Sequence, residues 1–144
     1  MELEYFLSKI SGFYDQNIRK FKEEAIGSDE VDHLTLHHWN YVEMIHELGN
    51  PTFTELAERL GVTKPSVTAI ANKLIRQGYL YKRQSSEDRR TYHLYLSEKG
   101  KRLIEAEHKA VIEFANQIRY ALSDAEINQL VEMFKKVVAS FSQK

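Results

Sequence analysis

The 144-residue chain contains no cysteine. This absence excludes disulfides, cysteine-based zinc sites, iron–sulfur ligation, thiol catalysis and thiol redox sensing. Glycine and proline are scarce, with six and two residues, while hydrophobic residues make up 42% of the chain, so we expect one folded domain rather than a disordered one. No apolar run approaches the roughly 20 residues that span a bilayer, and the N-terminus MELEYFLSKI lacks a signal-peptide pattern. We therefore expect a cytoplasmic protein without a membrane partner.

The N-terminal third of the chain has the apolar spacing of helices. Residues 3–25 carry apolar side chains at steps of three and four, which predicts an amphipathic helix that ends at Gly27. The polar residues 28–32 then read as a connector. A second helix is expected to begin at an N-cap formed by Thr35 and to end near Gly49.

The next segment predicts two short helices separated by a tight turn. Residues 52–55 have the capping-box pattern, in which a threonine at the N-cap is followed three residues later by glutamate, and the helix should end at Gly61. Thr63 is the next N-cap candidate, and Pro65 falls in the first turn, where its missing N–H costs nothing. This second helix should extend to about Gln77.

Two strands and two helices complete the predicted chain. Residues 79–83 and 91–96 are rich in aromatic and β-branched residues and flank a polar, charged segment, which predicts a β-hairpin with a long tip. Ser97 should cap a helix of about 20 residues or more, and a capping box at residues 123–126 should start a final helix. The predicted fold class is mainly α with a small β-hairpin wing.

The two short helices match the spacing of a helix-turn-helix. Counted from Phe53 as position one, Ala57 falls at position five, Gly61 at nine, Val67 at fifteen and Ile70 at eighteen. These are the positions where the motif needs a small residue at the helix crossing, a residue tolerant of positive φ in the turn, and aliphatic residues that hold the second helix. An ordinary helical hairpin is the alternative, but an arginine-bearing hairpin directly after the second helix favours a DNA-reading module.

The outward face of the second short helix, residues 64–77, carries no acidic side chain. At 100° per residue its outward positions are Pro65, Ser66, Ala69, Asn72, Lys73 and Arg76, with Lys64 and Thr68 on the flanks. The small, hydroxylated N-terminal end suits close approach to base edges, and the basic C-terminal end suits phosphates. The alternative interpretation is an ordinary solvated face that carries cations by chance.

The charge distribution separates this module from the rest of the chain. The formal net charge is −1, which by itself argues against a nucleic-acid-binding protein. Residues 52–100, however, hold nine basic and five acidic side chains, whereas the remainder holds 11 basic and 16 acidic ones. The near-neutral total therefore conceals a basic module on an acidic scaffold.

The segment TELAERLGVTKPSVTAIANKLIRQGYL, followed by SSEDRRTYHLYLSEKG, resembles the MarR family of winged-helix transcriptional regulators, and the resemblance extends over almost the whole chain. It implies an obligate homodimer whose two recognition helices enter successive major grooves of double-stranded DNA. It also implies that Arg90, or its neighbour Arg89, inserts into the flanking minor groove while Asp88 supports it. The candidate DNA-binding residues are Thr54, Lys64, Pro65, Ser66, Thr68, Ala69, Asn72, Lys73, Arg76, Asp88, Arg89 and Arg90.

The expected organisation is one compact domain with three regions. These are an N-terminal dimerisation helix with its connector (1–34), a winged helix-turn-helix (35–100) and C-terminal dimerisation helices (101–144). The long helices carry more large apolar residues than a small winged-helix core needs, which favours burial against a partner copy over packing within one chain. The phenylalanines concerned are Phe6, Phe13, Phe21, Phe114, Phe134 and Phe141.

The predicted function is sequence-specific DNA binding by a ligand-responsive repressor that recognises a pseudo-palindromic operator. The family usually couples DNA affinity to a small organic effector bound between the dimer helices and the winged helix. The candidate effector-binding residues are Phe13, Tyr14, Asn17, His38, Trp39 and Tyr41. Core or dimer packing explains these residues equally well, so an effector-independent DNA-binding or interaction protein remains an alternative.

Two further alternatives have weaker support. A zinc-responsive regulator would use histidines and carboxylates, and His33 and His37 have the i, i+4 spacing of a helical metal pair, but a cap at Thr35 would break their shared face. Zinc-sensing members of the family also need more histidine and carboxylate ligands in the last helices than His108 provides, because position 112 is isoleucine. The chain contains no catalytic motif of an enzyme, so we expect no catalysis, no metal site and no cofactor.

Overall fold

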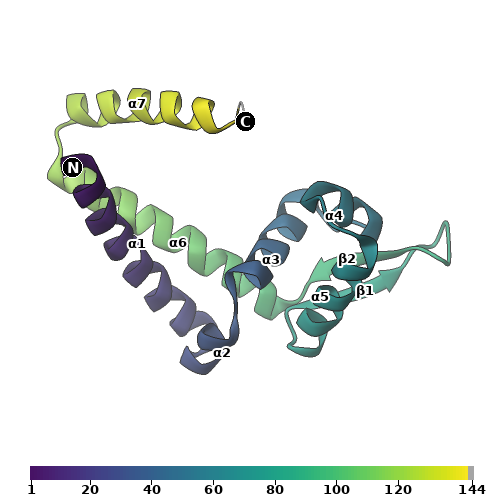
Figure 1. Ribbon diagram of the computed structural model, residues 1–144. Coiled ribbons are helices and arrows are strands. Elements are labelled where there is room, and N and C mark those ends of the chain that lie inside the picture. Colours follow the sequence, from purple (N-terminus) through teal and green to yellow (C-terminus); the bar gives the residue numbers. More distant parts are fainter. Residues whose placement is uncertain (143–144) are drawn as a thin grey trace.

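The computed structural model describes residues 1–142, and its long helices form an arm that carries a winged helix at one end (Figure 1). The arm consists of α1 (Glu2–Ile26) and α6 (Glu98–Ala121), which lie side by side. The short helix α2 (Ser28–His33) leads from α1 to the winged helix, and α7 (Asp124–Ser142) turns away at the far end of the arm. The last two residues of the predicted C-terminal region, 143 and 144, lie outside the described residues.

The winged helix comprises three helices and a two-stranded antiparallel sheet. Its elements are α3 (Leu36–Leu48), α4 (Phe53–Leu60), α5 (Lys64–Arg76), β1 (Leu80–Gln84) and β2 (Tyr92–Leu96). Leu80 lies opposite Leu96 and Gln84 opposite Tyr92, so the hairpin projects beyond the helices with the segment 85–91 at its tip (Figure 1). The mainly helical fold with a β-hairpin wing agrees with the predicted fold class.

The predicted helix caps are present. The hydroxyls of Thr35, Thr63 and Ser97 each accept a hydrogen bond from the backbone N–H three residues later. Thr52 and Glu55 form the complete capping box, in which each side chain accepts from the other residue's backbone N–H. These bonds satisfy N–H groups that have no partner within the helix, which is why the short helices begin where the sequence predicts.

The prediction of a polar connector at residues 28–32 is wrong, because this segment forms α2. Two acidic residues, Asp29 and Glu30, occupy its first turn, where they interact favourably with the positive end of the helix. The helix is too short to be recognised by apolar periodicity, and none of its residues is buried. One of its partners lies far away in the sequence, because Glu30 accepts a hydrogen bond from Tyr79.

A further strand-like segment lies beside the wing. The backbone N–H of Leu94 donates to the carbonyl oxygen of Pro51 at 2.8 Å, and Thr52 forms an isolated antiparallel bridge with His93. The start of α4 is therefore attached to β2. The sequence predicts only the two-stranded hairpin, because this additional pairing joins residues about 40 positions apart.

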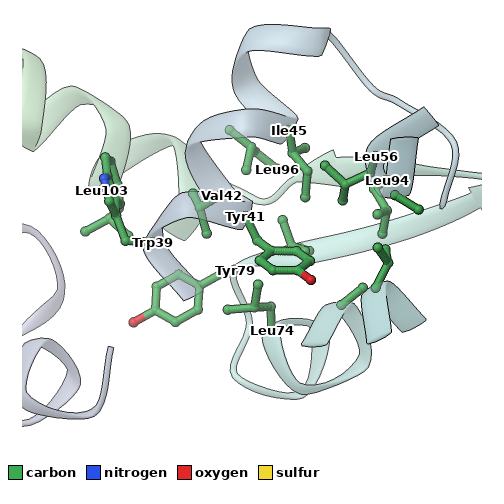
Figure 2. Packing of buried hydrophobic residues seen from close by; sticks show 14 residues of the cluster. Trp39, Tyr41, Val42, Ile45, Leu56, Leu74, Tyr79, Leu94, Leu96 and Leu103 are labelled. Atoms are coloured by element: carbon green, nitrogen blue, oxygen red, sulfur yellow. The ribbon is translucent and has the colours of Figure 1, made fainter. Parts of the chain in front are cut away.

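The hydrophobic core lies within the winged helix and extends to the start of α6 (Figure 2). Leu56 from α4, Leu74 from α5, Leu94 from β2 and Leu103 from α6 are all fully buried there. Val67 and Ala71 are also buried, which confirms the predicted inward face of α5. In contrast, α1 and α7 contain no buried residue, and no helix within residues 1–142 is long and apolar enough to cross a membrane.

Replacing Gly100 with alanine is expected to lower the free energy of unfolding by about 1–3 kcal/mol. Gly100 is buried in the first turn of α6, and a Cβ atom there would collide with the backbone carbonyl oxygen of Tyr79. Backbone atoms cannot move aside as a flexible side chain would. Urea denaturation of both proteins measures the change.

Gly12→Ala is the matched control because Gly12 is also helical, but a Cβ atom added to it would meet no neighbouring atom within 4 Å. This substitution should raise stability by about 0.5–1 kcal/mol, the usual gain from replacing glycine within a helix. Equal effects of the two substitutions would contradict the close packing of α6 against Tyr79.

Candidate nucleic-acid interface

Helix α5 presents a largely exposed polar face on the outside of the winged helix. Thr63 is its N-cap, and Pro65 lies in its first turn. The Ser66 hydroxyl lies 2.9 Å from that of Thr63. Most of the predicted outward residues are exposed, whereas Thr68 and Asn72 are partly buried. The Thr68 hydroxyl donates to the Lys64 carbonyl oxygen at 3.0 Å. The face is therefore accessible to a macromolecule.

A hollow of about 390 Å³ lies where the N-terminal ends of α4 and α5 meet the wing. We call it the wing hollow. It is lined by Thr52, Phe53, Thr54, Lys64, Lys82, Arg90, Thr91 and Tyr92. Three of these residues are cationic and none is acidic, so the hollow has the electrostatic character of a phosphate-binding surface. It brings together three residues that the sequence assigned to DNA contact, Thr54, Lys64 and Arg90.

Lys82 in the wing hollow was not among the residues predicted from the sequence. It lies on the same face of β1 as the buried Leu80, at the point where the hydrophobic core ends and the strand becomes exposed. Its ammonium nitrogen is 5.0 Å from the centroid of the Tyr92 ring on the paired strand, which is a cation–π distance. The alternation of β1 residues could have identified it, since positions 80 and 82 share a face in any strand.

The wing tip holds Arg90 beside Asp88. Oδ1 of Asp88 accepts from the Arg90 backbone N–H at 3.0 Å and from Nε of the same arginine at 3.4 Å. The Arg90 backbone N–H and guanidinium hold the pKa of the Asp88 carboxyl below its usual range. The Arg90 side chain is nevertheless 92% exposed. Arg89, in contrast, contributes its carbonyl oxygen to a hydrogen bond from Gln84.

The opposite face of the wing carries an aromatic pair that was not predicted from the sequence. Tyr81 and Tyr95 stack with ring centroids 5.2 Å apart, and the Arg83 guanidinium carbon lies 5.5 Å and 5.6 Å from the two rings. This arrangement stiffens the hairpin at its base. Lys82 and Tyr92, the two residues of the wing hollow that lie on the strands, are thereby held on a well-supported strand pair.

The six candidate effector-binding residues lie in several different surroundings. Phe13 and Asn17 line a hollow of about 340 Å³ between α1 and α6, where Asn17 Nδ2 donates to the Ala110 carbonyl oxygen at 2.9 Å. Trp39 lines a different hollow of about 230 Å³, and Tyr41 is buried in the hydrophobic core. Their joint role as an effector site therefore stays a prediction.

The remaining two candidates also have structural surroundings. Tyr14 packs edge to face against Phe114, with ring centroids 5.4 Å apart. His38 is only 5% exposed, and burial together with the nearby Lys73 lowers its pKa. Its Nδ1 has no hydrogen-bond partner among the described residues. Both burial and the nearby positive charge disfavour the charged imidazolium of His38.

The boundary between the arm and the winged helix contains a half-buried charge cluster. The Lys22 ammonium nitrogen lies 4.2 Å from the centroid of the Trp39 ring and 3.9 Å from Oε2 of Glu107. Burial lowers the pKa of Lys22 and raises that of Glu107. Within residues 1–142, no three histidine, aspartate or glutamate side chains come close enough to share a metal ion.

Comparisons with known proteins converge on one family of winged-helix proteins. The model of the MarR family matches residues 34–92, which include α3, α4, α5 and most of the wing. The transcriptional repressor MprA of Escherichia coli K12 is 32% identical over 94 residues, which make up 62% of this chain and 51% of MprA. The chain thus spans about half the length of that relative.

Solved structures resemble almost the whole chain. Streptococcus pneumoniae FabT in complex with DNA has a TM-score of 0.70 at 24% identity, covering 97% of this chain and 94% of FabT. RV1404 from Mycobacterium tuberculosis has a TM-score of 0.78 at 14% identity, covering 95% of this chain and 90% of RV1404. At such low identity these similarities establish the fold, including the arrangement of the arm helices with the winged helix.

Proposed function

Because this chain is a member of the MarR family of winged-helix proteins, we propose that it is a transcription regulator that binds double-stranded DNA. In this proposal α5 enters the major groove with its exposed face, and the wing follows the adjacent backbone and minor groove. The similar FabT structure contains DNA, and the relative MprA is a transcriptional repressor, which supports repression as the regulatory outcome.

The wing hollow is the observation that supports DNA binding most directly. It joins the N-terminal ends of two helices to Lys64, Lys82 and Arg90, with no carboxylate in its lining. Helix N-termini and cations both favour phosphate, so a backbone phosphate can dock here while the face of α5 meets the bases. All twelve residues predicted from the sequence to contact DNA belong to this proposed interface.

The exposed apolar faces of α1 and α7 support a homodimer. On α1 the large side chains Leu3, Phe6, Leu7, Ile10 and Phe13 are 49–70% exposed. On α7, Val131, Phe134, Val137, Val138 and Phe141 occupy one side of the helix and are 44–67% exposed. Uncovered apolar faces of this extent are typical of protein interfaces. The regions 1–34 and 101–144 would interlock between two copies and carry two winged helices, each comprising residues 35–100.

Regulation by a small organic effector is the finer part of the proposal. The hollow lined by Phe13 and Asn17 lies between α1 and α6, next to the apolar surface expected to meet the partner copy. A ligand bound there would bias the arrangement of the arm helices and thereby the spacing of the two winged helices.

The proposed function is tested by selecting bound duplexes from a random-sequence DNA pool and then measuring affinity against salt concentration. We expect an enriched inverted repeat with half-sites about 34–36 Å apart, one turn of the duplex. Affinity should fall by roughly 10³- to 10⁵-fold between 50 and 200 mM salt if about 6–10 phosphates are contacted. A protein that enriches no sequence, or whose binding does not change with salt, would contradict the proposal.

A further inference from the structure

A carboxylate on α2 contacts both the residue that precedes β1 in the winged helix and the first turn of α6 in the arm. Oε2 of Glu30 accepts a hydrogen bond from the Tyr79 hydroxyl at 2.8 Å and lies 3.1 Å from the Lys99 ammonium nitrogen. Tyr79 immediately precedes β1, and its ring is buried in the hydrophobic core with its hydroxyl at the outer edge of the labelled cluster (Figure 2). Lys99 belongs to the first turn of α6. We call Glu30, Tyr79 and Lys99 the Glu30 cluster.

The Glu30 cluster also contacts the C-terminal end of α5. Lys99 Nζ donates to the carbonyl oxygen of Gln77 at 2.8 Å and lies 4.4 Å from the centroid of the Tyr79 ring. Gln77 is the C-cap of α5, where unpaired carbonyls and the helix dipole favour a cation. One ammonium group therefore connects the C-terminal end of α5 with the carboxylate on α2.

The other side of α2 is joined to the arm. Arg19 of α1 donates from Nη2 to Oδ1 of Asp32 on α2 and from Nε to Glu23 at 2.7 Å. Since α2 buries no residue, apolar packing does little to fix its position. Its polar contacts to α1, Tyr79 and Lys99 form a continuous connection from the arm to the end of α5.

We propose that Glu30 is a positioning residue that, through Tyr79 and Lys99, fixes the orientation of α5 relative to the arm and so sets the affinity for DNA. This inference rests on the proposed function. Two recognition helices on one duplex must hold a fixed spacing, and a winged helix that pivots on its arm pays an ordering cost on binding. The cluster reduces that cost without touching DNA itself.

Glu30→Gln separates this proposal from simple electrostatics because the two predict opposite signs. The substitution removes one negative charge, so general attraction to DNA alone would strengthen binding. Loss of positioning should instead weaken binding to the selected duplex by about 5- to 150-fold, the usual range of coupling between sites. The slope of log affinity against log salt should stay unchanged, since no phosphate contact is lost.

Asp29→Asn is the matched control for charge and location. Asp29 is the exposed neighbour of Glu30 in α2, and its carboxylate has no hydrogen bond or ion pair within residues 1–142. The control should bind DNA as the wild type does, or slightly more tightly. A control that loses as much affinity as Glu30→Gln would overturn the proposal.

Tyr79→Phe tests the same connection while keeping the buried ring. It should weaken DNA binding in the same direction, and adding Glu30→Gln to it should cost less than the two single effects combined. Full additivity of the two effects on DNA affinity would show that the two residues act independently, and it would overturn the proposal that Glu30 acts through Tyr79.

Hydrogen exchange on the protein without DNA provides a second readout. Glu30→Gln should raise amide exchange in residues 28–33 and in 73–79, whereas Asp29→Asn should not. Unchanged exchange or unchanged DNA affinity in Glu30→Gln would overturn the positioning role. If the wild type selects no duplex at all, the proposed function fails, while raised exchange in Glu30→Gln would still support the connection between the arm and α5.

Discussion

Replacing Phe134 with glutamate is expected to convert the proposed homodimer into monomers and to weaken DNA binding by about 10²- to 10⁴-fold. Phe134 is 55% exposed at the centre of the apolar face of α7, which packs against nothing that would bury a residue in the single chain. A carboxylate at that position would have to be desolvated in a dimer interface without a counter-ion, which is strongly unfavourable. Two separate monomers would lose the gain in affinity that two linked winged helices obtain by binding one duplex together.

The oligomeric state is measured by light scattering coupled to size exclusion, and the DNA affinity by fluorescence anisotropy on the selected duplex. Gln129→Glu introduces the same charge change on α7, and Gln129 lies about 140° around the helix from Phe134. This control should remain dimeric and bind DNA normally. A Phe134→Glu protein that stays dimeric with full affinity would exclude this face of α7 from the interface.

Apolar periodicity predicts that a segment forms a helix with an apolar face, but not which of its apolar residues become buried. The spacing of apolar residues correctly predicted α1 as an amphipathic helix, because one apolar face is a local property of the chain. It could not predict which apolar residues the chain itself would cover. Phe13 is 61% exposed and Tyr41 only 1%, although both were candidates for the same effector site.

The short helices were predictable because their signals are local. The capping box joins Thr52 to Glu55 within a single turn, and Gly61 takes the left-handed conformation that ends α4. Both features depend on residues three to nine positions apart, so the sequence displays them directly. The prediction of the helix-turn-helix and of the inward face of α5 followed from these local signals.

Long-range contacts account for what the sequence did not reveal. Helix α2 is connected to Tyr79, 49 residues away from Glu30, and Lys82 gains its role only when β1 pairs with β2 beside α4. The contact between Glu30 and Tyr79 leaves no pattern within one element, and the alternation of β1 places Lys82 on the face of Leu80 without showing that this face meets α4 and α5. Of the residues that line the wing hollow, Thr54, Lys64 and Arg90 were named from the sequence as separate DNA contacts, whereas Lys82 was not.

Arg90→Ala is expected to weaken binding to the selected duplex by about 1–3 kcal/mol while leaving the melting temperature nearly unchanged. The Arg90 side chain is 92% exposed, and its ion pair with Asp88 at 3.4 Å lies in water, so it contributes little to folding. Its guanidinium lines the wing hollow and is available to DNA. Fluorescence anisotropy and thermal denaturation measure the two quantities.

Arg89→Ala is the control that distinguishes the two neighbouring arginines of the wing tip. Arg89 does not line the wing hollow, and its carbonyl oxygen rather than its side chain is engaged within the wing. We expect a smaller loss of affinity from Arg89→Ala than from Arg90→Ala. The reverse order would assign the minor-groove contact to Arg89.

The base pairs that flank the half-sites provide the sharper test of how Arg90 acts. Narrow A·T-rich minor grooves concentrate negative potential and attract an inserted guanidinium, so the wild type should prefer A·T to G·C flanks, and Arg90→Ala should lose that preference. Asp88→Asn makes the protein more positive, yet it should weaken binding to A·T-flanked duplexes, because the Asp88 carboxylate accepts from both the backbone and the side chain of Arg90. Tighter binding by Asp88→Asn would mean that Asp88 merely repels phosphate and does not orient the arginine.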